Sequence, residues 1–143
     1  MNKKIIGRLD KANFPELNLS EISIKIDTGA YTSSIHCENI EEREDGLHCT
    51  FLDKEHPEYN HKPFIFKSYN KIRVKSSNGI AQSRFEIKST IEIFNKVYKI
   101  SLSLSNRKEM KYPVLLGRKF LNKKFIVDPD LEYLSHNIQR HEH

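Results

Sequence analysis

The chain has 143 residues, of which 30% are charged and 37% hydrophobic, a balance typical of a globular protein rather than a disordered one. This length predicts one domain, residues 1–143. The net charge is +5, but the lysines are scattered, which favours a solvated basic surface over a nucleic-acid interface. The N-terminus lacks the apolar stretch of a secretory signal, and no run reaches the about 20 apolar residues of a membrane helix. We therefore expect a cytoplasmic protein with neither nucleic acid nor membrane as a partner.

Most of the chain has the pattern of short β-strands. Apolar or alternating runs predict strands at 22–26, 47–52, 64–66, 114–116 and 125–127. The stretch 38–62 is rich in Glu, Asp and His and contains Pro57, so it is predicted to be a polar insertion or long loop. One short helix is expected at about 118–122, after Gly117.

Two hairpins are predicted between these strands. Asn78-Gly79 separates alternating runs at 72–74 and 85–87, and Asn-Gly is a strong hairpin signal, so a projecting tip is expected near 76–83. A second, tight turn is expected at Asn95-Lys96. Together these elements predict a mostly antiparallel, all-β domain, either a small barrel or a sandwich.

The segment KIDTGAYTSSIH places an aspartate directly after a strand. Gly29 tolerates backbone conformations that other residues avoid, and Thr28 supplies a hydroxyl, so this turn could hold the Asp27 carboxylate rigidly. The same triplet is also typical of an ordinary Asx turn. Taken alone, the segment leaves both interpretations open.

A second segment, PVLLGRKFL at 113–121, runs from an apolar strand into Gly117, Arg118 and a short apolar helix. The pairing of DTGA with a distant apolar-apolar-Gly-Arg segment resembles the retropepsin-like aspartic peptidases. In that family the aspartate is catalytic, the threonine joins a hydrogen-bond network across a dimer, and a hairpin between the two motifs closes over a peptide. The resemblance therefore implies a small closed acid-protease barrel.

A narrower resemblance covers nearly the whole chain. The segments GRLDKANFPELNLSEISIKIDTGAYTSSIH, IRVKSSNGIAQSRFEI and LLGRKFLNKKFIVDPDLEYL are similar to a bacterial family named ATP-dependent zinc proteases, often found beside ATP-grasp amino-acid ligases. That family resembles the retropepsins in fold, and its older name fits its motifs poorly. Tyr31 departs from the family, whose members usually carry a basic residue after DTGA, so a local ion pair or substrate contact is expected to be lost.

One aspartate is only half of an aspartic peptidase site. Peptide hydrolysis without a metal needs one carboxylate to activate water while another donates a proton, and two nearby aspartates that share a proton can do this. Because the chain contains a single Asp-Thr-Gly triplet, the simplest arrangement is a homodimer in which each copy contributes Asp27.

The imidazole and thiol side chains raise the alternative of a zinc hydrolase. They gather at His36-Cys37, His48-Cys49, His56 and His61. The chain has neither Cys-x-x-Cys nor His-Glu-x-x-His, so scattered surface histidines and reduced thiols are favoured. A serine nucleophile among Ser33, Ser34 and His36 is disfavoured because no Gly-x-Ser-x-Gly elbow exists.

The predicted function is metal-independent hydrolysis of a peptide or peptide-like amide, with a peptide or protein as substrate and no cofactor. The predicted catalytic residues are Asp27, Thr28 and Gly29. The predicted substrate-binding residues are Ala30, Ser77, Asn78, Gly79 and Arg118, of which Arg118 is also expected to anchor the active-site turn to a neighbouring loop or to the dimer mate. The main alternative is a peptide-binding module that partners an ATP-grasp ligase without cleaving anything.

Overall fold

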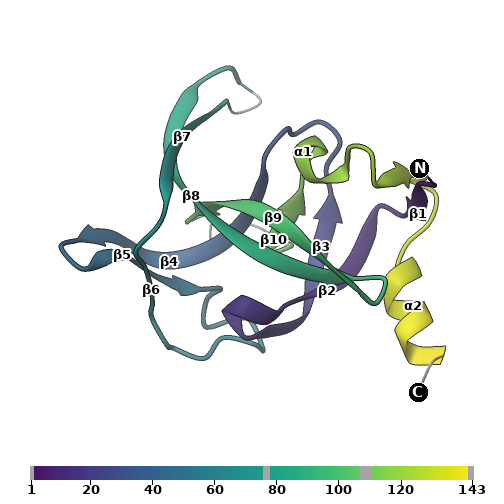
Figure 1. Ribbon diagram of the computed structural model, residues 1–143, viewed down its shortest axis with the longest axis horizontal. Coiled ribbons are helices and arrows are strands. Elements are labelled where there is room, and N and C mark those ends of the chain that lie inside the picture. The colour runs from purple at the N-terminus through teal and green to yellow at the C-terminus, as the bar shows by residue number, and fades with distance from the viewer. Residues whose placement is uncertain (1, 76–77, 107–110, 142–143) are drawn as a thin grey trace.

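The structure, a computed structural model, describes residues 2–75, 78–106 and 111–141 (Figure 1). Within these residues it consists mainly of strands. The strands are β1 Lys4–Ile6, β2 Leu9–Phe14, β3 Leu19–Ile26, β4 Ser33–Arg43, β5 Gly46–Phe51, β6 Phe64–Phe66, β7 Asn70–Lys75, β8 Ala81–Ile93, β9 Lys96–Ser105, β10 Val114–Leu116 and β11 Phe125–Val127. The helices are the 3₁₀ turn η1 Pro15–Leu17, α1 Arg118–Leu121 and α2 Leu134–His141.

Six of these strands form a closed barrel. Neighbouring strands pair in the order β10, β3, β2, β8, β9 and β4, and β4 pairs in turn with β10, which completes the ring. Strands β5 and β6 extend the sheet beyond β4, and β7 pairs with β8 outside the ring. β1 and β11 form a separate parallel pair. The predicted small closed barrel is therefore confirmed.

Alternating apolar residues of the strands fill the interior of this barrel. In β3, for example, Ile22, Ile24 and Ile26 are buried while Lys25 between them is exposed. Ile35 of β4 and Leu102 of β9 are fully buried as well. The period of two that predicted the strands thus corresponds to one face packed on the core and one face in solvent.

The β8–β9 hairpin is tight, as predicted, but its turn lies one residue earlier. Ile93 pairs with Lys96, so the turn residues are Phe94 and Asn95, whose φ values of 53° and 58° suit a two-residue hairpin turn. Phe94 takes the first turn position because its ring is buried, 6.0 Å from the ring of Phe125. The side chain that fixes the turn is therefore a core residue rather than a typical turn former.

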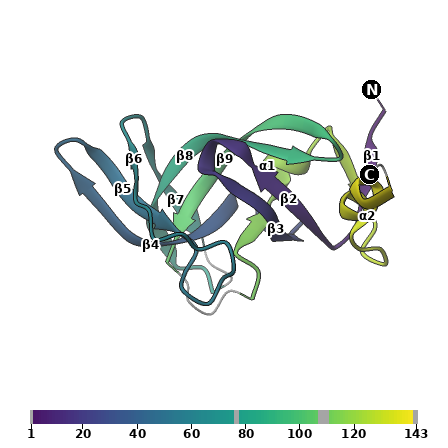
Figure 2. The same ribbon diagram turned by 90° about the horizontal axis from the view of Figure 1, so that it is seen from below.

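The β7–β8 hairpin projects from the barrel, and Figure 1 shows it as a separate arm, whereas Figure 2 shows β5 and α2 at opposite ends of the molecule. Lys75 pairs with Ala81, so residues 81–83, which were predicted to belong to the tip, are part of β8. Gly79 has a φ of +82°, the left-handed conformation that glycine adopts easily. The Asn-Gly signal therefore located the turn correctly.

The prediction of a polar insertion over 38–62 is wrong for its first half. β4 continues to Arg43 and pairs with β5 from Gly46 onward, so the region begins as a hairpin. Its outer end is exposed on both faces, from Glu41 to Asp45. A strand of this kind needs no apolar residues, so its sequence does not show the alternation of a half-buried strand. Only residues 52–63 are irregular.

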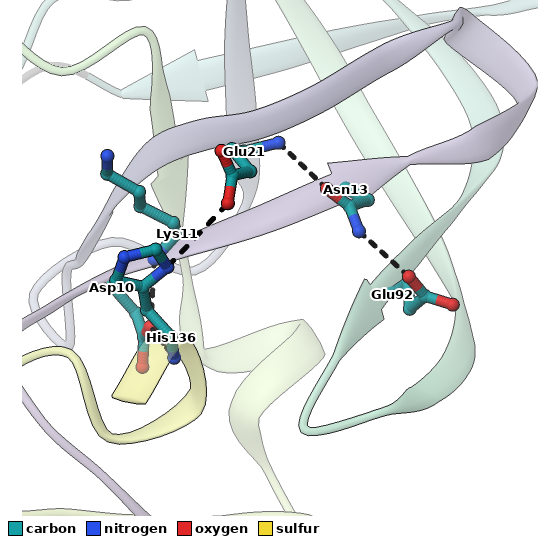
Figure 3. A network of polar contacts seen from close by, with 6 residues as sticks. All are labelled: Asp10, Lys11, Asn13, Glu21, Glu92 and His136. Atoms are coloured by element: carbon teal, nitrogen blue, oxygen red, sulfur yellow. Dashed lines mark hydrogen bonds and ion pairs between the residues drawn. The ribbon is translucent and has the colours of Figure 1, made fainter. Parts of the chain in front are cut away.

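The predicted short helix is confirmed as α1, whereas α2 was not anticipated. The buried carboxylate of Asp10 in β2 accepts hydrogen bonds from the backbone N–H groups of Ser135 and His136, at 3.0 and 3.1 Å, and so caps the first turn of α2 (Figure 3). Asn13 of the same strand forms a hydrogen bond with Glu92 of β8 at 2.8 Å.

No helix among the described residues is long and apolar enough to cross a membrane.

Candidate active site

Asp27 follows β3 directly and begins the loop that leads to β4. Its backbone N–H donates to the carbonyl of Leu116 at 2.9 Å, which extends the pairing between β3 and β10 by one residue. The side chain of Asp27 is half-buried. The barrel therefore fixes the backbone of Asp27 while its carboxylate remains accessible.

The loop itself orients that carboxylate. The N–H of Gly29 donates to Asp27 Oδ1 at 3.1 Å, and the N–H of Ala30 donates to the backbone carbonyl of Asp27 at 3.2 Å. Asp27 Oδ2 has no hydrogen-bond partner among the described residues. The Asx turn that the sequence allowed is thus present, and it holds one oxygen in place while the other is open to water or to a ligand.

β10 lies between the two strands that the Asp27 loop connects. It runs parallel to β3, where Leu116 pairs with Ile26, and antiparallel to β4, where Leu115 pairs with Ser34. The chain thus leaves along β3, turns at Asp27 and returns along β4, with a third strand inserted between them. This ψ-shaped arrangement brings the two predicted motifs, DTGA and LLGR, into direct contact.

Gly117 permits this close contact. A Cβ atom at this position would lie 2.6 Å from the carbonyl oxygens of both Tyr31 and Thr32, closer than real Cβ atoms approach. Its N–H also donates to the buried hydroxyl of Ser33 at 3.0 Å. Any larger residue would push α1 away from the Asp27 loop.

Arg118 binds the same loop from the first position of α1. Its backbone N–H donates to the carbonyl of Ala30 at 2.9 Å, and its Nη1 donates to the carbonyl of Thr28, also at 2.9 Å. Its guanidinium group lies over the ring of Tyr31, 5.8 Å from the centroid. Arg118 is therefore in contact with the loop, as expected of an anchor.

This stacking involves Tyr31, the position where the sequence departs from the family that it resembles. Tyr31 is 54% exposed, so its ring covers the guanidinium group of Arg118 rather than entering the core. A cation over an aromatic face is stabilised by about 0.5–1 kcal/mol at an exposed site. The expected basic residue would instead place a second positive charge beside Arg118.

The structure places the exposed residues Asn78 and Gly79 in the turn of the β7–β8 hairpin, whereas Asp27, Thr28, Gly29, Ala30 and Arg118 are joined by hydrogen bonds in the loop after β3. Asn78 Oδ1 accepts a hydrogen bond from the N–H of Ile80 at 3.3 Å. Ser77, also predicted to bind substrate, lies outside the described residues. Ile80 is 62% exposed and presents an apolar side chain at this tip.

The histidines and cysteines are engaged in separate pairs. His36 Nε2 lies 3.0 Å from Asp53 Oδ2, and its Nδ1 lies 3.2 Å from the carbonyl of Ser105. His48 pairs with Asp45 at 2.6 Å. Among the described residues no group of three or more His, Cys, Asp or Glu side chains could hold a metal ion. The described part of the chain therefore does not bring the predicted histidine and cysteine ligands together.

Sequence reasoning gave Ser33 no role in the loop. Its hydroxyl receives the Gly117 N–H, and its carbonyl accepts from Ser103 Oγ at 3.2 Å, so it connects the end of β10 to β9. The run TSS offered three hydroxyls without indicating which one turns inward. The inward hydroxyl is that of Ser33, because it binds the N–H of Gly117, which is 84 positions away in the sequence.

A six-stranded barrel with an inserted strand behind an Asp-Thr-Gly loop defines the class of retropepsin-like proteins. A family model described as RimB-like, retropepsin-like aspartic endopeptidase RimB, matches residues 5–137. The chain belongs to this family.

Relatives and a solved structure agree with that membership. Two proteins named "Probable alpha-L-glutamate ligase", from Shewanella pealeana and Desulfotalea psychrophila, are 37% and 36% identical to 90% and 91% of this chain. The chain spans only 29% of the length of each. A crystal structure of a Legionella pneumophila protein of unknown function (DUF785) is 30% identical, with a TM-score of 0.71 over 94% of this chain and 99% of that protein.

Proposed function

We propose that this chain is an aspartic endopeptidase that hydrolyses peptide or peptide-like amide bonds with a pair of Asp27 carboxylates. The observation that carries the proposal is the hydrogen bonding of the two Asp27 carboxylate oxygens. Oδ1 is fixed by the Gly29 N–H, while Oδ2 has no partner among the described residues. Such an arrangement suits a group that must act on a bound water or on a second carboxylate.

In the proposed mechanism the two carboxylates share one proton. The ionised Asp27 removes a proton from water, and the oxygen of this water attacks the amide carbonyl carbon. The protonated Asp27 donates its proton to the carbonyl oxygen as charge develops there. Two carboxylates a few ångströms apart cannot both ionise easily, which keeps one of them in the acid form.

The second Asp27 comes from a second copy of the chain in this proposal. The chain contains one Asp-Thr-Gly triplet, and a two-fold axis brings identical residues together. The side chain of Thr28 is exposed and has no hydrogen-bond partner among the described residues. It is therefore available for a contact with its counterpart across such an axis.

The remaining predicted site residues have supporting roles. The Gly29 N–H orients the carboxylate, the Ala30 N–H holds the backbone carbonyl of Asp27, and Arg118 holds the loop on α1, where it would also contact a bound peptide. The hairpin tip, with Ser77, Asn78 and Gly79, would cover an extended peptide and bind it through backbone groups.

Replacement of Asp27 by Asn tests the proposal. Pooled peptides should be cleaved by the wild type between about pH 4 and 7, where an aspartate dyad holds one proton, and not by Asp27→Asn. When an equal amount of Asp27→Asn exchanges freely with the wild type, the cleavage rate should fall to about half, because mixed dimers are inactive. Full activity of the variant, or no effect of mixing, would exclude the paired mechanism.

A binding module that partners an ATP-grasp ligase is the second candidate. The ligase names of the two relatives, which contain a segment similar to this chain, favour it. In that case peptides or ligase would bind without cleavage, and Asp27→Asn would leave binding intact. A zinc hydrolase, the third candidate, would lose its activity on treatment with a chelator, whereas the aspartic mechanism predicts no change.

A further inference from the structure

A cavity of about 510 Å³ lies between the β8–β9 hairpin and α1. Its walls come from the central part of both strands, from η1 and from α1, and Tyr98 of β9 contacts Phe120 of α1 beside it, with ring centroids 5.8 Å apart. The volume is in the range of sites for small molecules. It contains none of the predicted catalytic or substrate-binding residues.

Four lysines line this cavity, namely Lys88, Lys99, Lys119 and Lys124, against one acidic residue, Glu16. Glu16 already accepts a hydrogen bond from Ser89 at 3.3 Å. Lys124 donates to the carbonyl of Phe120 at 3.0 Å. The other three lysines form no ion pair with any described residue, so the cavity has an excess of positive charge.

Hydroxyl groups add neutral donors to the same walls. The buried Ser33 lines the cavity, and its oxygen accepts the Gly117 N–H, while its own proton has no acceptor among the described residues. Thr90 and Ser101 contribute two more hydroxyls. A buried hydroxyl with an unused proton is typical of a position where a ligand or water accepts it.

From this charge and these donors we infer that the cavity binds a small molecule carrying a pyrophosphate group. Like charges held close together repel, and a ligand with several negative charges relieves this repulsion more than a singly charged one. Arginine forks suit planar carboxylates, whereas lysine acts as a point charge toward phosphate oxygens. The cavity is lined by lysines and by no arginine, which favours phosphate.

The cavity adjoins the Asp27 loop without including it. Two cavity-lining residues connect it to this loop. The Lys119 N–H donates to the carbonyl of Tyr31 at 2.9 Å, and Ser33 directly follows the loop and accepts from the Gly117 N–H. The proposed ligand would therefore bind directly behind the loop. This site goes beyond the proposed peptidase function and does not depend on it.

Titration calorimetry of the full chain with inorganic pyrophosphate tests the inference. We expect saturable binding of one pyrophosphate per chain, weakened at least about tenfold in Lys88→Gln and in Lys99→Gln, and weakened by a rise from 50 to 200 mM salt, because the contacts are electrostatic. Lys67→Gln is the matched control, since Lys67 is exposed and outside the cavity. It should bind as the wild type does, and circular dichroism should show all three variants folded.

Two further ligands define the chemical class. If ADP binds more tightly than pyrophosphate, the natural ligand is a nucleotide. If the two bind equally, the site recognises only the pyrophosphate group. Both results support the site. If glutarate, a dicarboxylate, binds as tightly as pyrophosphate, the assignment of the site to a phosphate ligand is overturned. No binding, or an equal loss in Lys67→Gln, would overturn the site.

Discussion

Arg118 donates a hydrogen bond from its guanidinium Nη1 to the backbone carbonyl of Thr28, at 2.9 Å and across 90 positions of the chain. This hydrogen bond joins the two sequence motifs, DTGA and LLGR, directly. Because the backbone N–H of Arg118 also binds Ala30, α1 holds the carboxylate loop at two points. The rigidity of Asp27 therefore depends on a segment far away in the sequence.

Removal of the Arg118 side chain should loosen this loop. In Arg118→Ala we expect a loss of stability of about 1 kcal/mol, small because the contact is exposed, and faster amide exchange at Gly29 and Ala30. Arg118→Lys should restore little, because an ammonium group lacks the planar fork that binds Thr28 and stacks on Tyr31. Wild-type exchange rates in Arg118→Ala would show that the loop is held by other contacts.

Substitution of Gly117 should be far more costly than substitution of another glycine. Gly117→Ala places a Cβ 2.6 Å from two carbonyl oxygens, and we expect a loss of about 3 kcal/mol in the free energy of unfolding. Gly79→Ala is the control, because its Cβ meets nothing within 4 Å and its cost, about 1 kcal/mol, comes only from the positive φ. Urea denaturation measures both, and equal losses would contradict the steric account.

Asp10 should make the stability of the protein depend on pH. Burial raises the pKa of its carboxyl above the ordinary 3.8, while backbone N–H groups and His136 lower it in part. The folded state thus holds this proton more tightly than the unfolded chain does. The contribution of Asp10 is therefore complete below about pH 3.8 and declines as the pH rises through the raised pKa.

Comparison with Asp10→Asn isolates this effect, since the other carboxyl groups are common to both proteins. The difference in unfolding free energy, wild type minus variant, should decrease as the pH rises from about 3.5 to 6. Urea denaturation at each pH provides the measurement. An increase over that range would mean that the hydrogen bonds to Asp10 outweigh its burial.

The two cysteines should react slowly in the folded protein. Both are buried free thiols, and the hydrogen bond with Cys49, together with burial, raises the pKa of Cys37 well above 9.0. Only the thiolate reacts readily, so a disulfide reagent at pH 8 should modify neither residue until the chain unfolds. Denatured protein is the control, with two reactive thiols per chain, and rapid modification of the native protein would contradict the burial.

The sequence was most informative where local signals and motifs coincide. The strand 114–116 and the helix after Gly117 were predicted within one residue of β10 and α1. The insertion of β10 between β3 and β4 could not be predicted from the local sequence pattern. The alternation of apolar residues shows that a segment is a strand, but not which distant strand it pairs with. The helix α2 was missed for a related reason, since its N-terminal cap, Asp10, comes from β2 rather than from the residues before it.

Cross-linking at Thr28 is the most direct test of whether two Asp27 residues meet. If a two-fold axis pairs the loops, Thr28→Cys should form a disulfide-linked dimer under mild oxidation, because the exposed Thr28 adjoins the carboxylate. Lys67→Cys, on an exposed segment distant in sequence, should remain monomeric on a non-reducing gel. A shared Asp27 site predicts a covalent dimer of Thr28→Cys alone; a Thr28→Cys protein that stays uncross-linked would contradict it.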